Sequence, residues 1–501
     1  MTSGSLDLWA IIPELILAGT GLVLVPVAAF VHGHGNWRYL PMVLTVTALL
    51  AALGFTARML PWEDQAVFSG TYAIDGFGNV FKLILELGGL VSLLTITAHF
   101  RERDQVAHAP MALLFVTLGG VGLVSALDLG LIVLFLQMLS MPAYLLVTLV
   151  RSDRRGNEAT LKYFIYAAAA LAIMAYGLTF LYGMTGSLEL RTIGRELAAG
   201  GDAVWVALSL GLILIGYGFE MTLVPFHFWA PDVYSGATAP VTGFVSVVPK
   251  VAGFAAFLRF ALLAYPDGAA AWPTLVAVLA VATMTLGNLV ALRQSRLKRL
   301  LAYSSIAQAG YVLVAVAVAG RAEDALSAAA YYLSAYLFMN LAAFAVVAQV
   351  ERHRGSDELA QYRGFGLRAP WAGAVLALAL LSLAGLPPLA GFAGKVFVLT
   401  AAIDGDMTWL AVVAAVNMVI GLYYYVAVLA EMYLRRPPEP SSATPHPSGR
   451  PGPWTPSAPL APGGPAAYWP AYLLTTAGTL ALGILPGPVL RLLDEAQRLV
   501  S

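Results

Sequence analysis

Apolar runs of about twenty residues alternate with short polar segments along almost the whole chain, and this pattern predicts an all-α polytopic membrane protein. A helix of that length crosses the hydrocarbon core of a bilayer. Only Asp128 separates the fourth and fifth runs, which predicts a tight turn there. The first run is long enough to span and lacks a basic flank, so it is read as a helix and not as a cleaved signal. We expect about fourteen transmembrane helices, at 8–31, 40–60, 79–99, 110–127, 129–149, 160–182, 203–229, 240–264, 272–292, 298–319, 325–350, 370–400, 407–433 and 467–490.

The basic residues fall mainly on one side of the predicted membrane. With fourteen spans, eighteen Lys and Arg residues lie in alternate loops and six in the opposite loops and the C-terminus. Cytoplasmic loops are enriched in basic residues, so both termini are predicted to lie outside. The segment 434–466, rich in Pro, Ser and Gly, is predicted to be a flexible cytoplasmic linker before the last span.

Prolines inside the apolar runs indicate an internal duplication. Each of these prolines should kink or interrupt its helix. They are Pro142, Pro225, Pro249, Pro387 and Pro388. Two prolines of the first half recur 163 residues later, Pro110 as Pro273 and Pro225 as Pro388. The prediction is two inverted five-helix repeats with broken helices, as in many transporters; chance placement of the prolines is the alternative. The predicted organisation is helices 1–3 in 1–109, the repeats in 110–264 and 272–433, the linker in 434–466, and the last helix in 467–501.

Two lysines lie in apolar runs just after prolines, Lys250 after Pro249 and Lys395 shortly after Pro388. A charge at bilayer depth costs roughly 2.5–3.5 kcal/mol on insertion scales, so it usually faces a protein interior or a water-filled path. Carbonyls freed by a proline are tolerated where they line such a cavity. Removal from water disfavours the charged form of lysine, so these residues are candidates for taking up and releasing protons.

Composition agrees with a membrane protein and limits its chemistry. Of the 501 residues, 59% are hydrophobic and 11% are charged, against about 25% charged residues in soluble proteins. The absence of cysteine excludes thiolate-held iron–sulfur clusters and disulfides in this chain. No dinucleotide or phosphate-loop motif is present, so no cofactor is expected here. His32 and His34 have close spacing but are read as surface loop residues, and no metal site is expected.

The middle of the chain contains several long, distinctive motifs: NEATLKYFIYAA (157–168), LVPFHFWAPDVYSGATAPVTGFVSVVPKVAGFAAFLRF (223–260), NLVALRQSRLKRLLAYSSIAQAGYVLVA (288–315), YYLSAYLFMNLAAFAVV (331–347), GLPPLAGFAGKVFVLTAAI (385–403) and NMVIGLYYYVAVLAEMY (417–433). These motifs resemble subunit N of the proton-pumping NADH–quinone oxidoreductase, respiratory complex I. The resemblance covers about residues 75–435.

The resemblance implies a proton-translocating, antiporter-like subunit in the membrane arm of complex I, in a bacterial inner membrane. Its partners would be the other membrane-arm subunits and the lipid bilayer, with no nucleic acid. NADH, FMN, iron–sulfur clusters and quinone would be bound by partner subunits. A cation–proton antiporter subunit of the Mrp type and a non-pumping structural subunit of the same arm are the alternatives.

The family's proton path uses a glutamate in the fifth helix and lysines in the seventh, eighth and twelfth. Lys250 and Lys395 match the last two positions. Gln137 occupies the position of the glutamate, Glu220 that of the lysine in helix seven, and Gln308 that of a frequent histidine. The usual carboxylate–lysine switch is therefore missing.

Two hypotheses remain for these departures. In the first, Glu220 pairs with Lys250 across the broken helices and keeps an altered proton relay. In the second, the input channel is silent and the subunit is mainly structural.

Other polar groups have simpler interpretations. Lys82 and Glu86 are spaced i,i+4 and are expected to pair with each other or with a neighbouring subunit, with a proton-path role as the alternative. Arg259, near the end of its run, is expected to snorkel to the interface.

His227 and Asp232 follow the predicted break in the seventh run. Capping and loop anchoring compete with a role in proton entry for both residues. Tyr423, Tyr424 and Tyr425 are interpreted as packing or interface aromatics.

Overall fold

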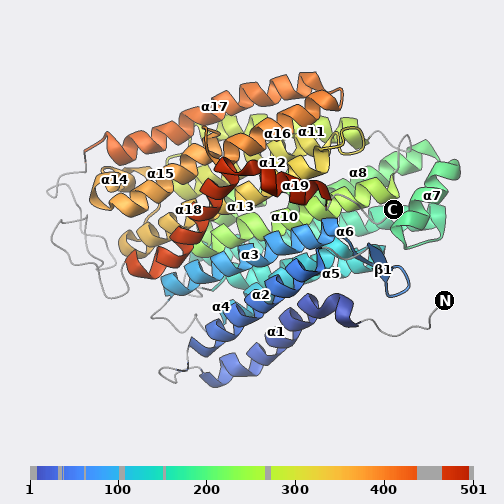
Figure 1. The fold of residues 1–501 in the computed structure, drawn as a ribbon, viewed down its shortest axis with the longest axis horizontal. Coiled ribbons are helices and arrows are strands. Elements are labelled where there is room, and N and C mark those ends of the chain that lie inside the picture. Colours follow the sequence, from blue (N-terminus) through green and yellow to red (C-terminus); the bar gives the residue numbers. More distant parts are fainter. Residues whose placement is uncertain are drawn as a thin grey trace.

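The computed structural model describes residues 8–31, 37, 39–60, 64–100, 108–149, 154–265, 272–436 and 465–495, and it shows a bundle of long, roughly parallel helices (Figure 1). Nearly all of the predicted linker, together with His32 and His34, lies outside the described residues. In the N-terminal part the elements are η1 (Leu8–Ile11), α1 (Ile12–Val31), α2 (Leu40–Met59), β1 (Gln65–Val67), β2 (Tyr72–Ile74) and α3 (Gly76–Phe100). The two strands pair antiparallel.

The remaining elements follow the predicted order of the two units. The first unit contains α4 (Ala109–Ser125), α5 (Leu129–Val147), α6 (Arg154–Thr185), α7 (Leu190–Gly200), α8 (Ala203–Glu220), α9 (Trp229–Gly236) and α10 (Ala239–Ala264). The second contains α11 (Trp272–Ala291), α12 (Leu297–Val316), α13 (Ala325–Arg354), η4 (Leu359–Tyr362), α14 (Phe365–Arg368), α15 (Pro370–Ala384), α16 (Ala390–Asp404) and α17 (Thr408–Tyr433). The chain continues with η6 (Pro465–Tyr468), α18 (Trp469–Ile484) and α19 (Pro486–Glu495).

Each of the fourteen predicted spans contains a helix. Within the described ranges, eleven helices are long and apolar enough to cross a membrane, and up to thirteen if each sharply bent pair counts as one span. The count is lower than fourteen because α4 is a shorter apolar helix and because some predicted spans are bent or broken. The all-helical membrane fold is thus confirmed.

The predicted breaks at Pro225 and Pro388 are confirmed. α8 ends at Glu220 and α9 begins at Trp229, whereas α15 ends at Ala384 and α16 begins at Ala390. Both breaks therefore occupy corresponding places in the two predicted units, whose boundaries stay a prediction.

Pro142 and Pro249 do not interrupt their helices, since they lie inside the continuous helices α5 and α10. A proline removes a single backbone hydrogen bond, and close packing of α10 on all sides compensates for that loss. The turn predicted at Asp128 is confirmed, because its Oδ1 caps α5 by accepting from the Gly130 and Leu131 amides at 2.8 and 3.2 Å.

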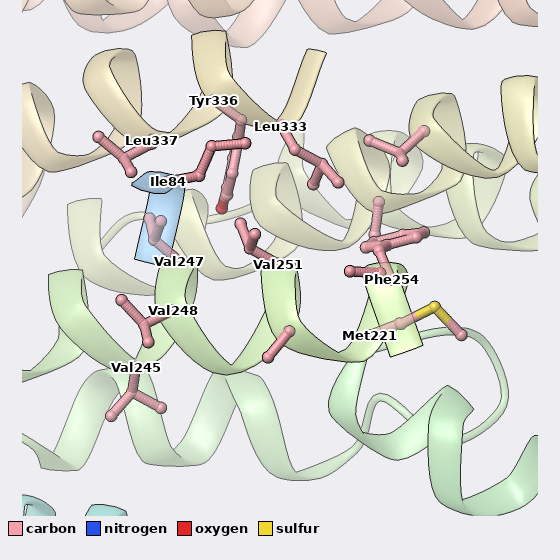
Figure 2. Packing of buried hydrophobic residues seen from close by; sticks show 14 of the residues in the cluster. Ile84, Met221, Val245, Val247, Val248, Val251, Phe254, Leu333, Tyr336 and Leu337 are labelled. Carbon is pink, nitrogen blue, oxygen red and sulfur yellow. The ribbon is translucent and has the colours of Figure 1, made fainter. Parts of the chain in front are cut away.

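Among the described helices, α3, α4, α10, α12 and α13 are buried along most of their length and form the interior of the bundle (Figure 1). Apolar side chains between α3, α10 and α13 make a closely packed layer, in which Ile84 lies near Val247, Val248 and Leu337 (Figure 2). The outer helices α1, α2, α5, α6 and α17 are buried over only 33–39% of their apolar stretches. Apolar side chains on the outer surface of the bundle suit contact with lipid. This explains why these outer helices are hydrophobic on all sides.

Arg259 does not snorkel, so this prediction is wrong. Its side chain is only 1% exposed, and its two terminal nitrogens donate to the Asp75 carboxylate at 2.6 and 2.7 Å. Its Nε donates to the Val124 carbonyl oxygen at 2.7 Å. Asp75 comes 184 positions earlier in the chain, so local sequence spacing gives no sign of this pair. The bidentate pair joins the N-terminal helices to α10.

We expect Asp75→Asn to destabilise the protein strongly. Loss of one partner leaves a buried, uncompensated guanidinium, which typically costs about 3–5 kcal/mol. Thermal unfolding of the detergent-extracted protein measures this effect. The control is Arg435→Gln, because Arg435 is 60% exposed in its pair with Glu431 and should change stability by less than about 1 kcal/mol. Equal stability of the two variants would contradict a structural role for the Asp75–Arg259 pair.

Candidate functional site

Lys395 lies in α16, and its ammonium is bound by the end of the preceding helix. Its Nζ donates to the carbonyl oxygens of Leu383 and Ala384, at 2.9 and 2.8 Å. These are the last carbonyls of α15, which lack intrahelical partners and lie at the negative end of the helix dipole. Gly385, with φ of +89°, turns the chain directly after them. Lys395 is 5% exposed, and its Nζ lies 5.3 Å from the centre of the Tyr311 ring.

Lys250 lies in the middle of α10, and its ammonium is bound by α12. Its Nζ donates to the carbonyl oxygen of Ser305 at 2.8 Å and also to the Ser305 hydroxyl. That hydroxyl accepts from the Tyr336 hydroxyl at 2.8 Å and contacts the Tyr234 hydroxyl at 3.2 Å. Lys250 is 2% exposed. Within the described residues, neither this lysine nor Lys395 has a carboxylate partner.

A hydrogen-bonded network extends from the Lys395 group along α12. Gln308, at the family's histidine position, donates from Nε2 to the Leu383 carbonyl at 3.1 Å and to the Tyr425 hydroxyl at 3.0 Å. The Tyr332 hydroxyl donates to Gln308 Oε1. The hydroxyls of Tyr425 and Ser304 lie 2.5 Å apart. Because Ser304 precedes Ser305, consecutive residues of α12 serve the two lysine groups, although no direct hydrogen bond joins the groups in the described chain.

Glu220 is the last residue of α8 and borders a small cavity. Its Oε1 accepts from the Ser140 hydroxyl of α5 at 2.8 Å, and its buried Oε2 has no hydrogen-bond partner among the described residues. The cavity measures about 20 Å³, taken as the space open to the centre of a water molecule. That is enough for about one water. Gln137 lines the same cavity, so two of the three positions that depart from the family pattern face one space.

The expected direct pair between Glu220 and Lys250 is not formed, and this prediction is wrong. Glu220 bonds to α5, whereas Lys250 bonds to α12. The two nevertheless lie close to one stretch of α10, because a Cβ added at Gly253 would come 3.0 Å from the Glu220 Cβ. Gly253 follows Lys250 by three positions, so Glu220 packs against α10 about one helical turn from Lys250.

The remaining candidates lie apart from the two lysines. Asp232 pairs with Lys162 of α6 at 2.8 Å, and both side chains are partly exposed, which favours the anchoring interpretation for Asp232. His227 is buried and its ring stacks on Phe228, with ring centres 4.7 Å apart.

Lys82 and Glu86 do not pair with each other, so this part of the prediction is wrong, whereas pairing with a neighbouring subunit stays a prediction. Lys82 Nζ lies 2.7 Å from Glu14 Oε1, and Glu86 accepts from the Thr56 hydroxyl at 2.9 Å. Glu14 lies on α1 and Thr56 on α2. The spacing of residues within α3 cannot reveal partners on other helices.

Several network residues were missed by sequence reasoning. Tyr425 belongs to the Lys395 group, and Tyr424 donates to Asn288 Oδ1 at 3.1 Å, so both are more than packing aromatics. Tyr423 is 68% exposed, as expected for an interface aromatic. One sequence feature could have revealed these network residues, namely polar side chains spaced i,i+4 on otherwise apolar helices, as Tyr332 and Tyr336 are.

A bundle of membrane-length helices, two of them broken and one break binding a buried lysine, defines the antiporter-like class of membrane transport proteins. The family model described as "NADH:quinone oxidoreductase/Mrp antiporter, TM" matches residues 126–421.

Relatives and solved structures narrow the assignment. The chain is 39% identical over 446 residues to NADH-quinone oxidoreductase subunit N of Chlorobium chlorochromatii, covering 86% of each chain. It is 35% identical over 504 residues to subunit N of Trichlorobacter lovleyi, covering 99% and 98%. A chain of respiratory complex I from Thermus thermophilus with bound aureothin matches with a TM-score of 0.79 and 35% identity, covering 97% of this chain and all of that one. The Mrp complex from Dietzia matches at 0.83 and 23% identity, covering 98% and 97%, which shows a common fold alone. The chain therefore belongs to the subunit N family of NADH–quinone oxidoreductase, as its motifs predict.

We expect Gly385→Ala to weaken the Lys395 site. A Cβ there would come 2.7 Å from Lys395 Cδ and 3.0 Å from Nζ. The displaced ammonium would lose hydrogen bonds that contribute about 1.5–3 kcal/mol each. NADH-driven proton transport in membrane vesicles should therefore fall relative to NADH oxidation.

Gly186→Ala is the matched control, since Gly186 also has positive φ, +65°, but an added Cβ there would meet nothing within 4 Å. Both variants share a backbone strain of order 1 kcal/mol. Equal transport in the two variants would show that the Gly385 contact is unimportant.

Proposed function

We propose that this chain carries protons across the bacterial inner membrane as part of the membrane arm of NADH–quinone oxidoreductase, with Lys250 and Lys395 as the carriers. The observation that carries the proposal is the setting of these lysines. Both ammonium groups are buried in the bundle and bound only by neutral oxygens of the described chain. The basic loops support an orientation with both termini outside.

A lysine bound in this way can change its protonation with small movements. Carbonyl and hydroxyl oxygens offset part of the loss of hydration, but less fully than a carboxylate would. A shift of the α15 end would alter two of the contacts of Lys395 together. Hydroxyl groups such as those of Ser304 and Tyr425 both donate and accept hydrogen bonds, so they suit proton transfer next to the lysine.

The first unit would work through an altered relay. In the family pattern a glutamate faces a lysine, whereas here the same cavity contains Gln137 and Glu220. The cavity thus keeps one ionisable group, and that group can hold a proton itself. The absence of a direct contact with Lys250 requires that the proton reach Lys250 through water or through a rearrangement of the broken helix.

The redox reaction that drives transport would take place in partner subunits. The chain contains no cysteine with which to hold an iron–sulfur cluster and no dinucleotide motif. NADH, FMN, the clusters and quinone are accordingly assigned to other subunits. This chain would contribute to catalysis as a translocase subunit.

The test of the altered relay is Glu220→Gln, which keeps the size of the side chain and its bond to Ser140. We expect fewer protons transported per electron passed to quinone, as for Lys250→Ala. The measurement is the proton-to-electron ratio in vesicles that contain the assembled complex.

The double variant Gln137→Glu with Glu220→Lys restores the family pattern and should transport protons at least as well as the unmodified protein. Normal transport by Glu220→Gln together with loss in Lys250→Ala would refute the altered relay and favour a silent input channel. Normal transport by all single variants would favour a purely structural subunit.

A further inference from the structure

The N-terminal helices enclose a second group of buried ionisable side chains, outside the matched family region that begins at residue 126. Lys82 and Glu86 lie on α3, and Glu14 lies in the first turn of α1. All three are buried. Lys82 Nζ lies 2.7 Å from Glu14 Oε1, and the Tyr72 hydroxyl donates to the same oxygen at 2.6 Å.

One cation therefore serves two carboxyl groups. Glu86 accepts a hydrogen bond from Thr56 alone, and the Oε2 atoms of both Glu86 and Glu14 are buried without hydrogen-bond partners among the described residues. If both carboxyls were ionised, one negative charge would remain buried without compensation, at a cost of several kcal/mol. One of them must carry a proton.

Among the described residues, the hydrogen bonds and ion pairs of this group include no second cation. β2 contributes Tyr72, which already bonds to Glu14, and α2 contributes Thr56. The guanidinium of Arg259 on α10 is paired bidentately with Asp75, so this pair is internally neutral. The proton therefore belongs to Glu86, because Glu14 is the carboxylate in contact with the ammonium.

Lys82 can reach either carboxyl group. Residues four apart on a helix face each other, with Cβ atoms about 5–6 Å apart, so Glu86 is within reach of the Lys82 side chain. The ammonium can pass one proton to Glu14, and the resulting amine can take the proton of Glu86. The O–H bond of Glu86 breaks and one forms on Glu14. Before and after the transfer the group contains one ammonium, one carboxylate and one carboxylic acid; between the two steps it contains a neutral amine and two carboxylic acids.

The three side chains are arranged at different depths. With a rise of 1.5 Å per residue, Lys82 lies about 9 Å and Glu86 about 15 Å along α3 from its start at Gly76. Glu86 is thus near the middle of the helix, whereas Glu14 lies at the beginning of α1. Transfer from Glu86 to Glu14 would move a proton from the interior toward that end of the bundle.

An apolar layer separates this group from the lysines of the main site. Ile84 of α3 belongs to this layer with Val247, Val248 and Leu337 (Figure 2), and an added Cβ at Gly88 would lie 3.0 Å from Val248 and 3.2 Å from Leu337. No hydrogen bond crosses from the group to Lys250 within the described residues.

We propose that Glu14, Lys82 and Glu86 form a second proton-binding site, independent of Lys250 and Lys395, in which one proton moves between two carboxyl groups that share a single lysine.

The experiment is infrared difference spectroscopy of the assembled complex between low and high pH, in H2O and in D2O. The unmodified complex should show protonated-carboxyl absorption that shifts in D2O. Glu86→Gln should abolish the component that belongs to Glu86, here called the band, whereas any component that belongs to Glu220 should stay. Glu14→Gln should also abolish it, although Glu86 is still present, because Lys82 then pairs with Glu86 and ionises it. Glu196→Gln, on the exposed side of α7, is the control and should leave the band unchanged.

The double variant Glu14→Gln with Lys82→Met provides the sharpest outcome. It removes both charges of the present ion pair, so Glu86 should be protonated and the band should return. A band that survives in Glu86→Gln, survives in Glu14→Gln, or fails to return in the double variant would overturn the proposal. The readout does not depend on proton pumping, so its failure is separate from failure of the transport function.

Discussion

The two lysines at the centre of this protein are held by neutral oxygens, and the rest of the site depends on that constraint. Lys395 is bound by the carbonyl end of α15, and Lys250 by the backbone and hydroxyl of Ser305. An ammonium group in such surroundings is less strongly stabilised than one paired with a carboxylate. Its charge therefore responds to small changes in helix position, which a transport cycle can supply.

Other buried cations in the same bundle are fixed by carboxylates. Arg259 donates two hydrogen bonds to Asp75. Lys298 Nζ donates to Glu351 Oε1 at 2.5 Å and to the Ala237 carbonyl oxygen at 2.8 Å. Removing either partner of such a pair would strand a charge, so these contacts suit structural roles. Arg259 and Lys298 thus differ from Lys250 and Lys395, whose partners in the described chain are neutral oxygens.

Much of the fold could be predicted from the sequence because its causes are local. Apolar run length fixed the helices, and Asp128, Pro225 and Pro388 marked turns and breaks. The partners of buried charges could not be predicted in the same way. Arg259 pairs with a residue 184 positions away, and Lys82 pairs with a different helix instead of its i,i+4 neighbour.

The candidate site was likewise predictable where local motifs mark its residues, and not where contacts between distant helices determine it. Lys250, Lys395 and Gln308 were located by motif, and the structure gives them their bonded neighbours. The roles of Ser304, Ser305 and Tyr425 depend on how α12 packs against α10 and α17, which no local pattern records. Gln137 and Glu220 were located by motif as well, but only the structure shows that both line one cavity.

The most direct test of the account is the proton-to-electron ratio of the assembled complex with Lys395→Met, which keeps much of the length of the side chain and removes its titratable group. Lys395→Arg is the companion variant, because it keeps a permanent positive charge that does not titrate in proteins. The account predicts a lower ratio in both, since a proton carrier must gain and lose its charge. A normal ratio in both variants would contradict the claim that Lys395 carries protons.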